Sequence, residues 1–340
     1  MTAAGVALGA GVAFFASALL SVLLARSRSS FWPRDVPNAR SLHAQPTPRT
    51  GGVAILLGVA AALAVAGATA DTSFAWIGAA TTLLALLSFA DDRRGLPVSV
   101  RLAAQALAAA ALVWGAGLAA QRVWLPLAGD VALGPFAAPL SFLGILWLTN
   151  LYNFMDGMDG LAGSMTAIGG AFLGVACWRG GDGGGAAVSF FLSAAAAGFL
   201  IQNRPPARIF LGDVGAIPVG FLVAALALRA SAAGRVDLGA SCLVFAPFIV
   251  DATVTLVRRA LAGERVWTPH RSHHYQRLVL SGLSHARVLR WEIALMGVSG
   301  AAALAYATGS GPVRVTILAA LALLYAVAGA AVKAVERARR

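Results

Sequence analysis

Polar side chains that could do chemistry gather in a few short segments of this sequence, between long apolar stretches. Asp91 and Asp92 end one such stretch, and adjacent carboxylates can bind a divalent cation or accept a proton. Asn153, Asp156 and Asp159 follow at intervals of three, so they share one face wherever the backbone is helical. Oxygen donors at this spacing suit a hard cation such as Mg²⁺.

Two later segments indicate a ligand that carries phosphate. Asp213 stands between glycines in the segment from Phe210 to Gly215, where phosphate oxygens can approach the backbone and the acid can hold a metal against them. The segment from His270 to Arg277 mixes Arg with His, and both can donate hydrogen bonds to a diphosphate. Zinc is less favoured than Mg²⁺ because no cysteine accompanies these histidines.

Each segment also has a structural interpretation that the residues alone leave open. The acidic pair could cap the following helix or bind neighbouring arginines. The spaced amides and acids could be solvated at a membrane surface, and Asp213 could cap a helix in a glycine-rich turn. Phe210 could be an interface anchor or a platform for a nucleobase. The His/Arg segment could lie against anionic lipid.

The composition of the chain defines the setting of these segments. Its 340 residues are 59% hydrophobic and 12% charged, whereas soluble globular domains average about 25% charged residues. This excludes an ordinary soluble protein and indicates a membrane protein. The net charge of +12 could suggest nucleic acid, but a chain this apolar has no large soluble face for it, so we expect no nucleic-acid partner. The two cysteines lie in apolar segments and predict no disulfide framework.

A helix needs about 20 apolar residues to cross the hydrocarbon core of a bilayer. Runs of this kind predict an all-α, polytopic membrane helical bundle with about 11 transmembrane helices, formed by a single integral-membrane domain over residues 1–340. The spans are expected near residues 3–25, 51–70, 73–90, 99–119, 136–152, 161–178, 187–202, 214–231, 238–257, 290–308 and 313–332.

The distribution of basic residues predicts the orientation, because Lys and Arg are more frequent in cytoplasmic loops. All but five of the 26 basic residues fall in one set of alternate loops, which places the N-terminus outside and the C-terminus in the cytoplasm. The polar segments lie in the same set, in loops near 26–50, 91–98, 152–160, 203–213 and 258–290. The exceptions are Arg122, Arg179, Arg229, Arg235 and Arg314.

Taken in order, the motifs resemble those of the polyprenyl-phosphate N-acetylhexosamine-1-phosphate transferases, membrane enzymes of the glycosyltransferase family 4 type. The resemblance covers residues 30 to 290, and five motifs in register are far more specific than any one of them. They are Asp35-Val-Pro-Asn38-Ala-Arg40-Ser-Leu-His43 with Pro46-Thr-Pro-Arg49-Thr-Gly51-Gly52; Asp91-Asp92 with Leu96-Pro97; Asn150-Leu-Tyr-Asn153-Phe-Met-Asp156-Gly-Met-Asp159-Gly; Phe210-Leu-Gly-Asp213-Val-Gly; and Pro269-His270-Arg271-Ser-His273-His274.

The resemblance implies transfer of a sugar-1-phosphate from a UDP-N-acetylhexosamine to undecaprenyl phosphate, giving a lipid-diphosphate-sugar and UMP. It implies Mg²⁺ as the cofactor, with Mn²⁺ as a substitute, and a multi-pass protein of the bacterial inner membrane with its active site on the cytoplasmic face. A homodimer is compatible with it. Direct attack by the lipid phosphate and a covalent intermediate on a carboxylate both remain open.

By position in the motifs, Asp91 and Asp92 resemble the catalytic pair, and we expect Asp91 to take the proton of the lipid phosphate. Asp213 and Asn153 resemble the metal ligands. Asp251, in the ninth expected span, is given no role. The nucleotide- and substrate-binding residues that the resemblance implies are Asp156, Asp159, Asn203, Phe210, His270, Arg271, His273 and His274, with Phe210 as the uracil platform and Asp159 at the base edge.

The histidine segment departs from parts of the family, and this bears on the sugar. It lacks the three consecutive histidines of the peptidoglycan translocase, which argues against a UDP-MurNAc-pentapeptide donor. It also lacks the His-x-His-His pattern of the GlcNAc-1-phosphate enzymes. It is most similar to the branch that initiates O-antigen in lipopolysaccharide biosynthesis, so we expect UDP-GlcNAc or a 6-deoxy relative such as FucNAc or QuiNAc.

The alternative function is transport of a small molecule or a lipid-linked compound. Transporters more often place polar residues at mid-membrane on broken helices and are built from paired inverted halves. Here the polar segments lie at one membrane face and the spans show no such pairing. The sequence therefore favours the enzyme.

Overall fold

The computed structural model describes residues 2–37, 45–67, 71–266, 268 and 270–338. Residues 38–43 of the first motif, which include Asn38, Arg40 and His43, and Pro269 of the last motif lie outside the described residues. The described helices are α1 (Ala3–Arg26), α2 (Gly51–Ala66), α3 (Thr72–Arg94), α4 (Val98–Ala110), α5 (Ala137–Phe154), α6 (Leu161–Arg179), α7 (Gly183–Asn203), α8 (Asp213–Ala232), α9 (Leu238–Val244), α10 (Ala246–Leu261), α11 (His274–Leu280), α12 (His285–Thr308) and α13 (Gly311–Ala338).

Short elements complete the described chain. The π-helical turn η1 (Ala111–Gly115) extends α4, and the 3-10 turn η2 (Gly134–Phe136) precedes α5. Strands β1 (Arg34–Asp35) and β2 (Thr47–Pro48) pair antiparallel, with Asp35 opposite Thr47. Strands β3 (Arg122–Leu125) and β4 (Gly129–Ala132) form a second antiparallel hairpin between η1 and η2.

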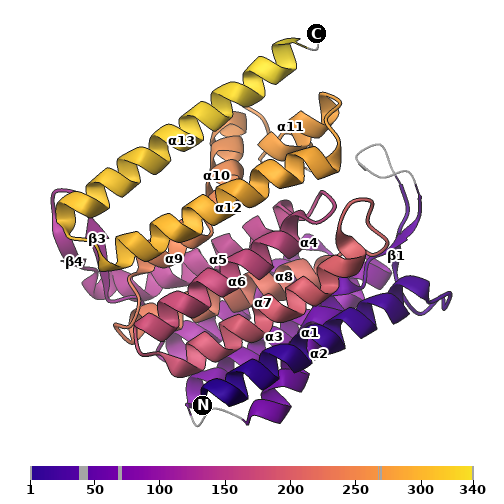
Figure 1. The fold of residues 1–340 in the computed structure, drawn as a ribbon, viewed down its shortest axis with the longest axis horizontal. Helices are drawn as coiled ribbons and strands as arrows, with labels where there is room; N and C mark the ends of the chain where they lie inside the picture. The colour runs from indigo at the N-terminus through magenta and orange to yellow at the C-terminus, as the bar shows by residue number, and fades with distance from the viewer. Residues whose placement is uncertain (1, 38–44, 68–70, 267, 269, 339–340) are drawn as a thin grey trace.

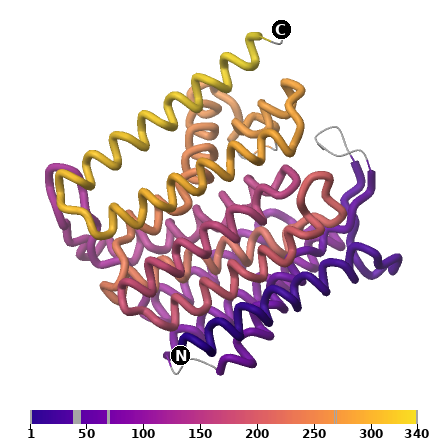
Figure 2. The backbone as a smooth tube through the Cα atoms, viewed as in Figure 1, coloured from indigo at the N-terminus to yellow at the C-terminus, as the bar shows by residue number. Residues whose placement is uncertain are grey.

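The arrangement is a polytopic bundle of helices, as the sequence predicts. Within the described residues, nine helices are long and apolar enough to cross a membrane, and the bent pair α9 and α10 is a tenth candidate. The second expected span corresponds to α2, a shorter apolar helix of 16 residues. Figure 2 shows the long helices running beside one another, with α10 turned away from them.

The ninth expected span, 238–257, is not one continuous helix. It is divided at Phe245 into α9 and α10, which meet at 82°. Pro247 lies in the first turn of α10, where its missing N–H costs nothing, and in the middle of a longer helix it would remove a backbone hydrogen bond. The apolar composition of this segment predicts a span but not the bend.

Helix α8 is the centre of the bundle. Of its apolar 18-residue window, 89% is buried, compared with 11% for α13, which lies along the upper edge in Figure 1. A helix that is apolar on all sides can be enclosed by its neighbours, and α8 packs against α2, α3 and α5.

Both ends of α8 are fixed by specific contacts. Near its C-terminal end, the Arg229 guanidinium contacts Asp182 (2.5 Å) and Asp71 (2.6 Å), which are the N-caps of α7 and α3. At its N-terminal end, α2 approaches so closely that a Cβ added to Gly52 would lie 2.1 Å from the Cα of Gly215. We call the end of the bundle where α3 ends and α8 begins the site end.

The close approach of α2 also satisfies backbone groups. The N–H groups of Gly51 and Gly52 donate to the carbonyls of Phe210 (2.8 Å) and Leu211 (2.9 Å). Free N–H groups at the start of a helix need such partners when they are buried. The start of α2 is therefore bonded to the segment that leads into α8.

The contact between Gly52 and Gly215 predicts the effect of a single methyl group. Gly52→Ala should lower the thermal midpoint in detergent by several degrees, because the new Cβ meets backbone that cannot move aside. Gly144→Ala is the matched control, since a Cβ there meets nothing within 4 Å and helical Ala is favoured over Gly. Equal midpoints for the two variants would contradict the packing described here.

Candidate active site

The site is built around Asp213, the first residue of α8, and two guanidinium groups. Arg49 Nη2 lies 3.1 Å from Asp213 Oδ1 and 2.9 Å from Asp92 Oδ1. Arg101 Nη1, on α4, lies 3.5 Å from Asp213 Oδ2 and 3.0 Å from Asp91 Oδ2. The fold thus brings together both acids of the expected catalytic pair and the expected metal ligand, with the Asp213 carboxylate contacting both arginines.

The two acids of the pair are not equivalent. The Asp92 side chain is fully buried, and its Oδ2 accepts a hydrogen bond from the N–H of Val214 (3.0 Å) in the first turn of α8. Asp91 accepts a hydrogen bond from the N–H of Leu96 through Oδ1 (2.6 Å), while its Oδ2 faces Arg101. Asp92 therefore caps a helix, as the structural interpretation of the acidic pair suggested. The helix that Asp92 caps is α8, and not α4, which follows Asp92 in the sequence.

Asp156 lies in the loop of residues 155–160, between α5 and α6, and faces the same cluster. Burial and the nearby carboxylate of Asp213 together raise the pKa of Asp156 to about 7, while Arg49 opposes the shift. Asn153 is half-buried in the last turn of α5, one helical turn before Asp156. Of the three polar residues spaced at intervals of three in the sequence, Asp156 thus lies at the site end.

Two residues expected to bind substrate hold loops together in this structure. The Asn203 carboxamide accepts a hydrogen bond from the N–H of Gly160 (3.0 Å) and donates one to the carbonyl of Ile209 (2.8 Å). Asp159 Oδ2 accepts a hydrogen bond from the N–H of Ala207 (3.1 Å) and lies 3.1 Å from His285 Nδ1. These contacts fix the 155–160 loop against the loop of residues 204–212.

The backbone around Phe210 is fixed on both sides. Its N–H donates to the carbonyl of Pro48 and its own carbonyl accepts from the N–H of Gly51, both at 2.8 Å. The side chain of Phe210 is half-buried two residues before Gly212, whose φ of 75° favours glycine. A Cβ on Gly212 would lie 2.2 Å from the carbonyl oxygen of Arg49, so this turn brings Arg49 and Asp213 together.

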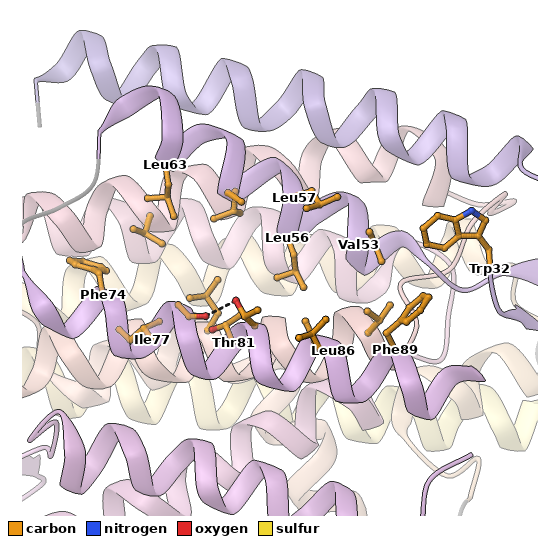
Figure 3. A pocket seen from close by; sticks show the side chains of 18 of the residues that line it. Trp32, Val53, Leu56, Leu57, Leu63, Phe74, Ile77, Thr81, Leu86 and Phe89 are labelled. Carbon is orange, nitrogen blue, oxygen red and sulfur yellow. Dashed lines mark hydrogen bonds between the residues drawn. The ribbon is translucent and has the colours of Figure 1, made fainter. Parts of the chain in front are cut away.

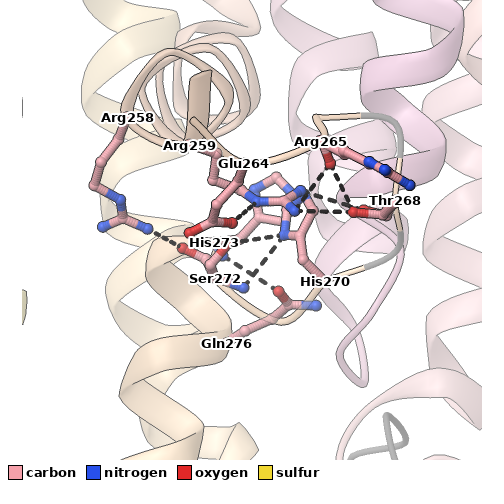
Figure 4. A network of polar contacts seen from close by, with 9 residues as sticks. All are labelled: Arg258, Arg259, Glu264, Arg265, Thr268, His270, Ser272, His273 and Gln276. Carbon is pink, nitrogen blue, oxygen red and sulfur yellow. Dashed lines mark hydrogen bonds and ion pairs between the residues drawn. The ribbon is translucent and has the colours of Figure 1, made fainter. Parts of the chain in front are cut away.

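The histidine segment forms a second polar cluster (Figure 4). The rings of His270 and His273 are 4.8 Å apart, and the buried His273 ring stacks on Tyr275 at 5.9 Å. Burial lowers the pKa of His270 to about 4, helped by the neighbouring His273, so His270 is neutral at pH 7. Arg271, which follows His270 directly in the chain, is half-buried.

One tyrosine connects this cluster to the carboxylates. Tyr275 Oη donates a hydrogen bond to the carbonyl of Phe154 (3.3 Å) at the end of α5. A Cβ on Gly157 would lie 2.3 Å from the same hydroxyl, so the 155–160 loop passes directly over Tyr275. The histidine segment is therefore packed against the loop that carries Asp156.

Sequence reasoning did not single out three residues that organise the site. Arg49 stood within a recognised motif without a role of its own, and Arg101 was counted only as an orientation signal. Asp251 was left without a role, yet its carboxylate contacts His273 and His274 at 3.4 and 3.5 Å. The signal for Arg49 was its place just before Gly51 and Gly52. Arg101 and Asp251 lie outside the recognised motifs, and no local pattern connects Arg101 with Asp213, 112 residues away, or Asp251 with His274, 23 residues away.

The donor set fits Mg²⁺ only if the ligand supplies part of the coordination. Within the described residues, no three His, Cys, Asp or Glu side chains converge to hold a metal ion by themselves. The available donors are carboxylate and amide oxygens, which Mg²⁺ prefers, and it is commonly held by one or two carboxylates together with phosphates and water. Asp213, 19% exposed, and Asn153 are the protein groups that would hold it.

An apolar groove of about 520 Å³ opens between α2 and α3 (Figure 3). Leu57 and Leu86 lie along its length, and Trp32 and Phe89 lie at its site end. Val214, which follows Asp213 directly, also lines it. A hydrocarbon surface thus begins beside the charged cluster.

Comparison with known proteins gives consistent matches. The profile of glycosyl transferase family 4 matches residues 74–231. A Bacillus subtilis protein named "Probable undecaprenyl-phosphate N-acetylglucosaminyl 1-phosphate transferase" is 32% identical over 254 residues, 74% of this chain and 71% of the relative. The decaprenyl-phosphate N-acetylglucosaminephosphotransferase of Mycolicibacterium smegmatis is 33% identical over 312 residues, 82% and 75% of the two chains. An Escherichia coli undecaprenyl-phosphate alpha-N-acetylglucosaminyl 1-phosphate transferase is 23% identical over 257 residues, 74% and 70%.

The raised pKa of Asp156 predicts how stability depends on pH. Between its ordinary value of 3.8 and about 7 the folded protein binds this proton more tightly than the unfolded chain, so stability falls as pH rises through that range. In EDTA, the thermal midpoint of Asp156→Asn should fall less between pH 4.5 and pH 7.5 than that of the wild type. The exposed Asp130→Asn should behave like the wild type. Parallel curves for Asp156→Asn and the wild type would show that Asp156 ionises normally.

Proposed function

Because the chain belongs to glycosyl transferase family 4, we propose that it transfers N-acetylhexosamine-1-phosphate from a UDP-N-acetylhexosamine to undecaprenyl phosphate. The products are an undecaprenyl-diphosphate-sugar and UMP. The reaction class is that of the relatives, whose names specify a polyprenyl phosphate acceptor and N-acetylglucosamine 1-phosphate. The enzyme interpretation is thereby favoured over the transporter.

The observation that carries the proposal is the position of Asp213 between Arg49 and Arg101, at 3.1 and 3.5 Å. Both arginine side chains are 29% exposed, so a phosphate that arrives at the cluster can share them with the acids. Guanidinium groups bind phosphate through paired donors and lose little hydration in doing so. The cluster thus offers fixed positive charge where a diphosphate must be held.

In the proposed reaction, an oxygen of the lipid phosphate attacks the phosphorus that bears the sugar, and the bond to the UMP oxygen breaks. A phosphate monoester near pH 7 is already mostly ionised, so stabilising charge matters more than removing a proton. Arg49 and Arg101 supply part of that stabilisation, and Asp91 accepts any remaining proton of the lipid phosphate. Mg²⁺ bound by Asp213 and Asn153 would neutralise charge on the diphosphate.

Asp92 is given a positioning role in this scheme. Its buried carboxylate is held by the N–H of Val214 and by Arg49, so it orients the start of α8. The Asp91 side chain is 7% exposed and lies on the side of Arg101 and Asp213. This division of roles supports the choice of Asp91 for proton transfer.

The remaining features support a lipid acceptor and a water-borne donor. The groove between α2 and α3 offers hydrocarbon surface beside the carboxylates, as an isoprenoid tail needs. We propose that the site end faces the cytoplasm of the bacterial inner membrane, because the basic residues are concentrated in its loops. The donor sugar is GlcNAc, which the relatives' names favour, or the 6-deoxy sugar that the histidine segment favours, with O-antigen initiation as the pathway in the latter case.

A panel of nucleotide sugars tests the reaction. Purified protein with Mg²⁺ and undecaprenyl phosphate should release UMP from UDP-GlcNAc or from a 6-deoxy relative, and the lipid product should gain one sugar and one phosphate by mass spectrometry. UDP-glucose, which lacks the N-acetyl group, is the control and should give little product. Absence of UMP with every UDP-N-acetylhexosamine would refute the proposed function.

The role of Asp213 is tested separately by metal dependence. EDTA should abolish turnover and added Mg²⁺ should restore it in the wild type, with Mn²⁺ as a partial substitute. Asp213→Asn should lower kcat by at least 100-fold without losing the folded state, because the amide is a weaker Mg²⁺ ligand and leaves the arginines with less negative charge. Asp130→Asn is the control for an acid far from the site. Turnover near the wild-type rate in Asp213→Asn would remove this residue from the metal site.

A further inference from the structure

The buried acid of α10, Asp251, makes an unusual set of contacts with the histidine segment. Its Oδ1 accepts a hydrogen bond from the N–H of His274 (2.9 Å), and its Oδ2 lies 3.4 Å from the N–H of Tyr275. The hydroxyl of Thr255, one turn further along α10, donates to Oδ1 at 3.1 Å. The carboxylate therefore satisfies the free N–H groups with which α11 begins.

The same carboxylate also faces two imidazole rings. Asp251 Oδ1 is 3.4 Å from Nδ1 of His273 and 3.5 Å from Nδ1 of His274. These distances are longer than those of hydrogen bonds, so the acid faces the Nδ1 edges of both rings without bonding to them. The Nε2 atom lies on the opposite edge of each ring, so it is turned away from Asp251. An acid behind a histidine is a common way of fixing which ring nitrogen is free for a ligand.

Other contacts hold the neighbouring parts of the segment, and Gln276 Oε1 accepts a hydrogen bond from the N–H of His273 (3.3 Å). Arg258 donates to the carbonyl of Ser272 (2.6 Å), and Arg259 is bonded to Glu264 (2.6 Å) and to the carbonyl of Thr268 (3.2 Å), as Figure 4 shows. Beyond the histidines, Arg277 pairs with Glu336 of α13. Asp251 contacts the segment between these two sets of contacts, at His273 and His274.

The contact continues from α11 into the carboxylate cluster. Tyr275, whose N–H faces Asp251, places its hydroxyl against the carbonyl of Phe154 and beneath Gly157. Asp156 lies between these two residues in the chain. A shift of α11 away from Asp251 would therefore displace both the histidines and the loop that carries Asp156.

We propose that Asp251 is a positioning residue of the active site, which sets the orientation of His273 and His274 toward the diphosphate of the donor and seats α11 against the Asp156 loop. This inference rests on the proposed function for its substrate, but the contacts that it describes do not. Asp251 acts as a positioning residue, and its side chain is only 8% exposed. Its effect is exerted through the imidazoles and through Tyr275.

Hydrogen exchange tests the positioning role without relying on activity. Asp251→Asn keeps one acceptor oxygen but loses the charge and the second acceptor, so amides in residues 270–280 and in residues 154–160 should exchange at least fivefold faster than in the wild type. Thr253→Val is the matched control on the same helix, because the Thr253 hydroxyl has no hydrogen-bond partner in the described part of the chain. Faster exchange in the first segment alone would overturn the coupling to the Asp156 loop, and unchanged exchange in both would overturn the proposal.

A double-mutant cycle tests the route through the histidines. Asp251→Asn should raise the KM for the UDP-sugar at least tenfold, with a smaller change in kcat and no change in the thermal midpoint beyond a few degrees. In a His273→Ala/His274→Ala background, the same substitution should raise KM by much less than tenfold, because the imidazoles are gone and only the contact through Tyr275 remains. Independent, additive effects would overturn the proposal. If the wild type itself releases no UMP, the proposed function fails while the exchange experiment still decides the structural role of Asp251.

Discussion

The contact of Asp213 with Arg49 and Arg101 is the interaction on which the site depends. Charges taken out of water are costly unless they are paired, and a helix bundle made for a bilayer offers little water. Here the acids at the end of α3 and the start of α8 share two guanidinium groups, so none of them is left as an isolated charge. The partial positive charge at the start of α8 favours the same acids.

This cluster can exist only because the surrounding backbone is tightly fixed. Gly52 and Gly215 let α2 and α8 touch, and Arg229 secures the other end of α8 to two helix starts. Asn203 and Asp159 join the two loops that flank the cluster. Many of the polar side chains at the site end therefore position other residues, and fewer of them are free to contact a ligand.

The architecture brings two kinds of surface together. A charged cluster suited to a diphosphate lies at the end of a bundle whose sides are hydrocarbon, and an apolar groove begins beside Val214. A lipid phosphate and a nucleotide sugar differ in the same way, because the first is anchored in the bilayer and the second comes from water. Under the proposed function, the phosphate groups of both substrates would meet the arginines and acids where the helices end.

The class of fold and the positions of most spans could be predicted from the sequence alone, because apolar runs are a local property. The segments expected to carry the chemistry stay a prediction from residue spacing. The sequence could not predict the division of the ninth span at Phe245, since Pro247 is compatible with a span and the bend depends on packing. It also could not show that Asp92 is held at the start of α8 while Asp91 faces Arg101, or give Asp251 and Arg101 a role. Arg49 and Asp213 are 164 residues apart, and Asp92 and Val214 are 122 apart. Contacts between such distant segments form only when the neighbouring helices enclose α8. The three-dimensional fold, and not the local sequence pattern, therefore sets which charged side chains face one another.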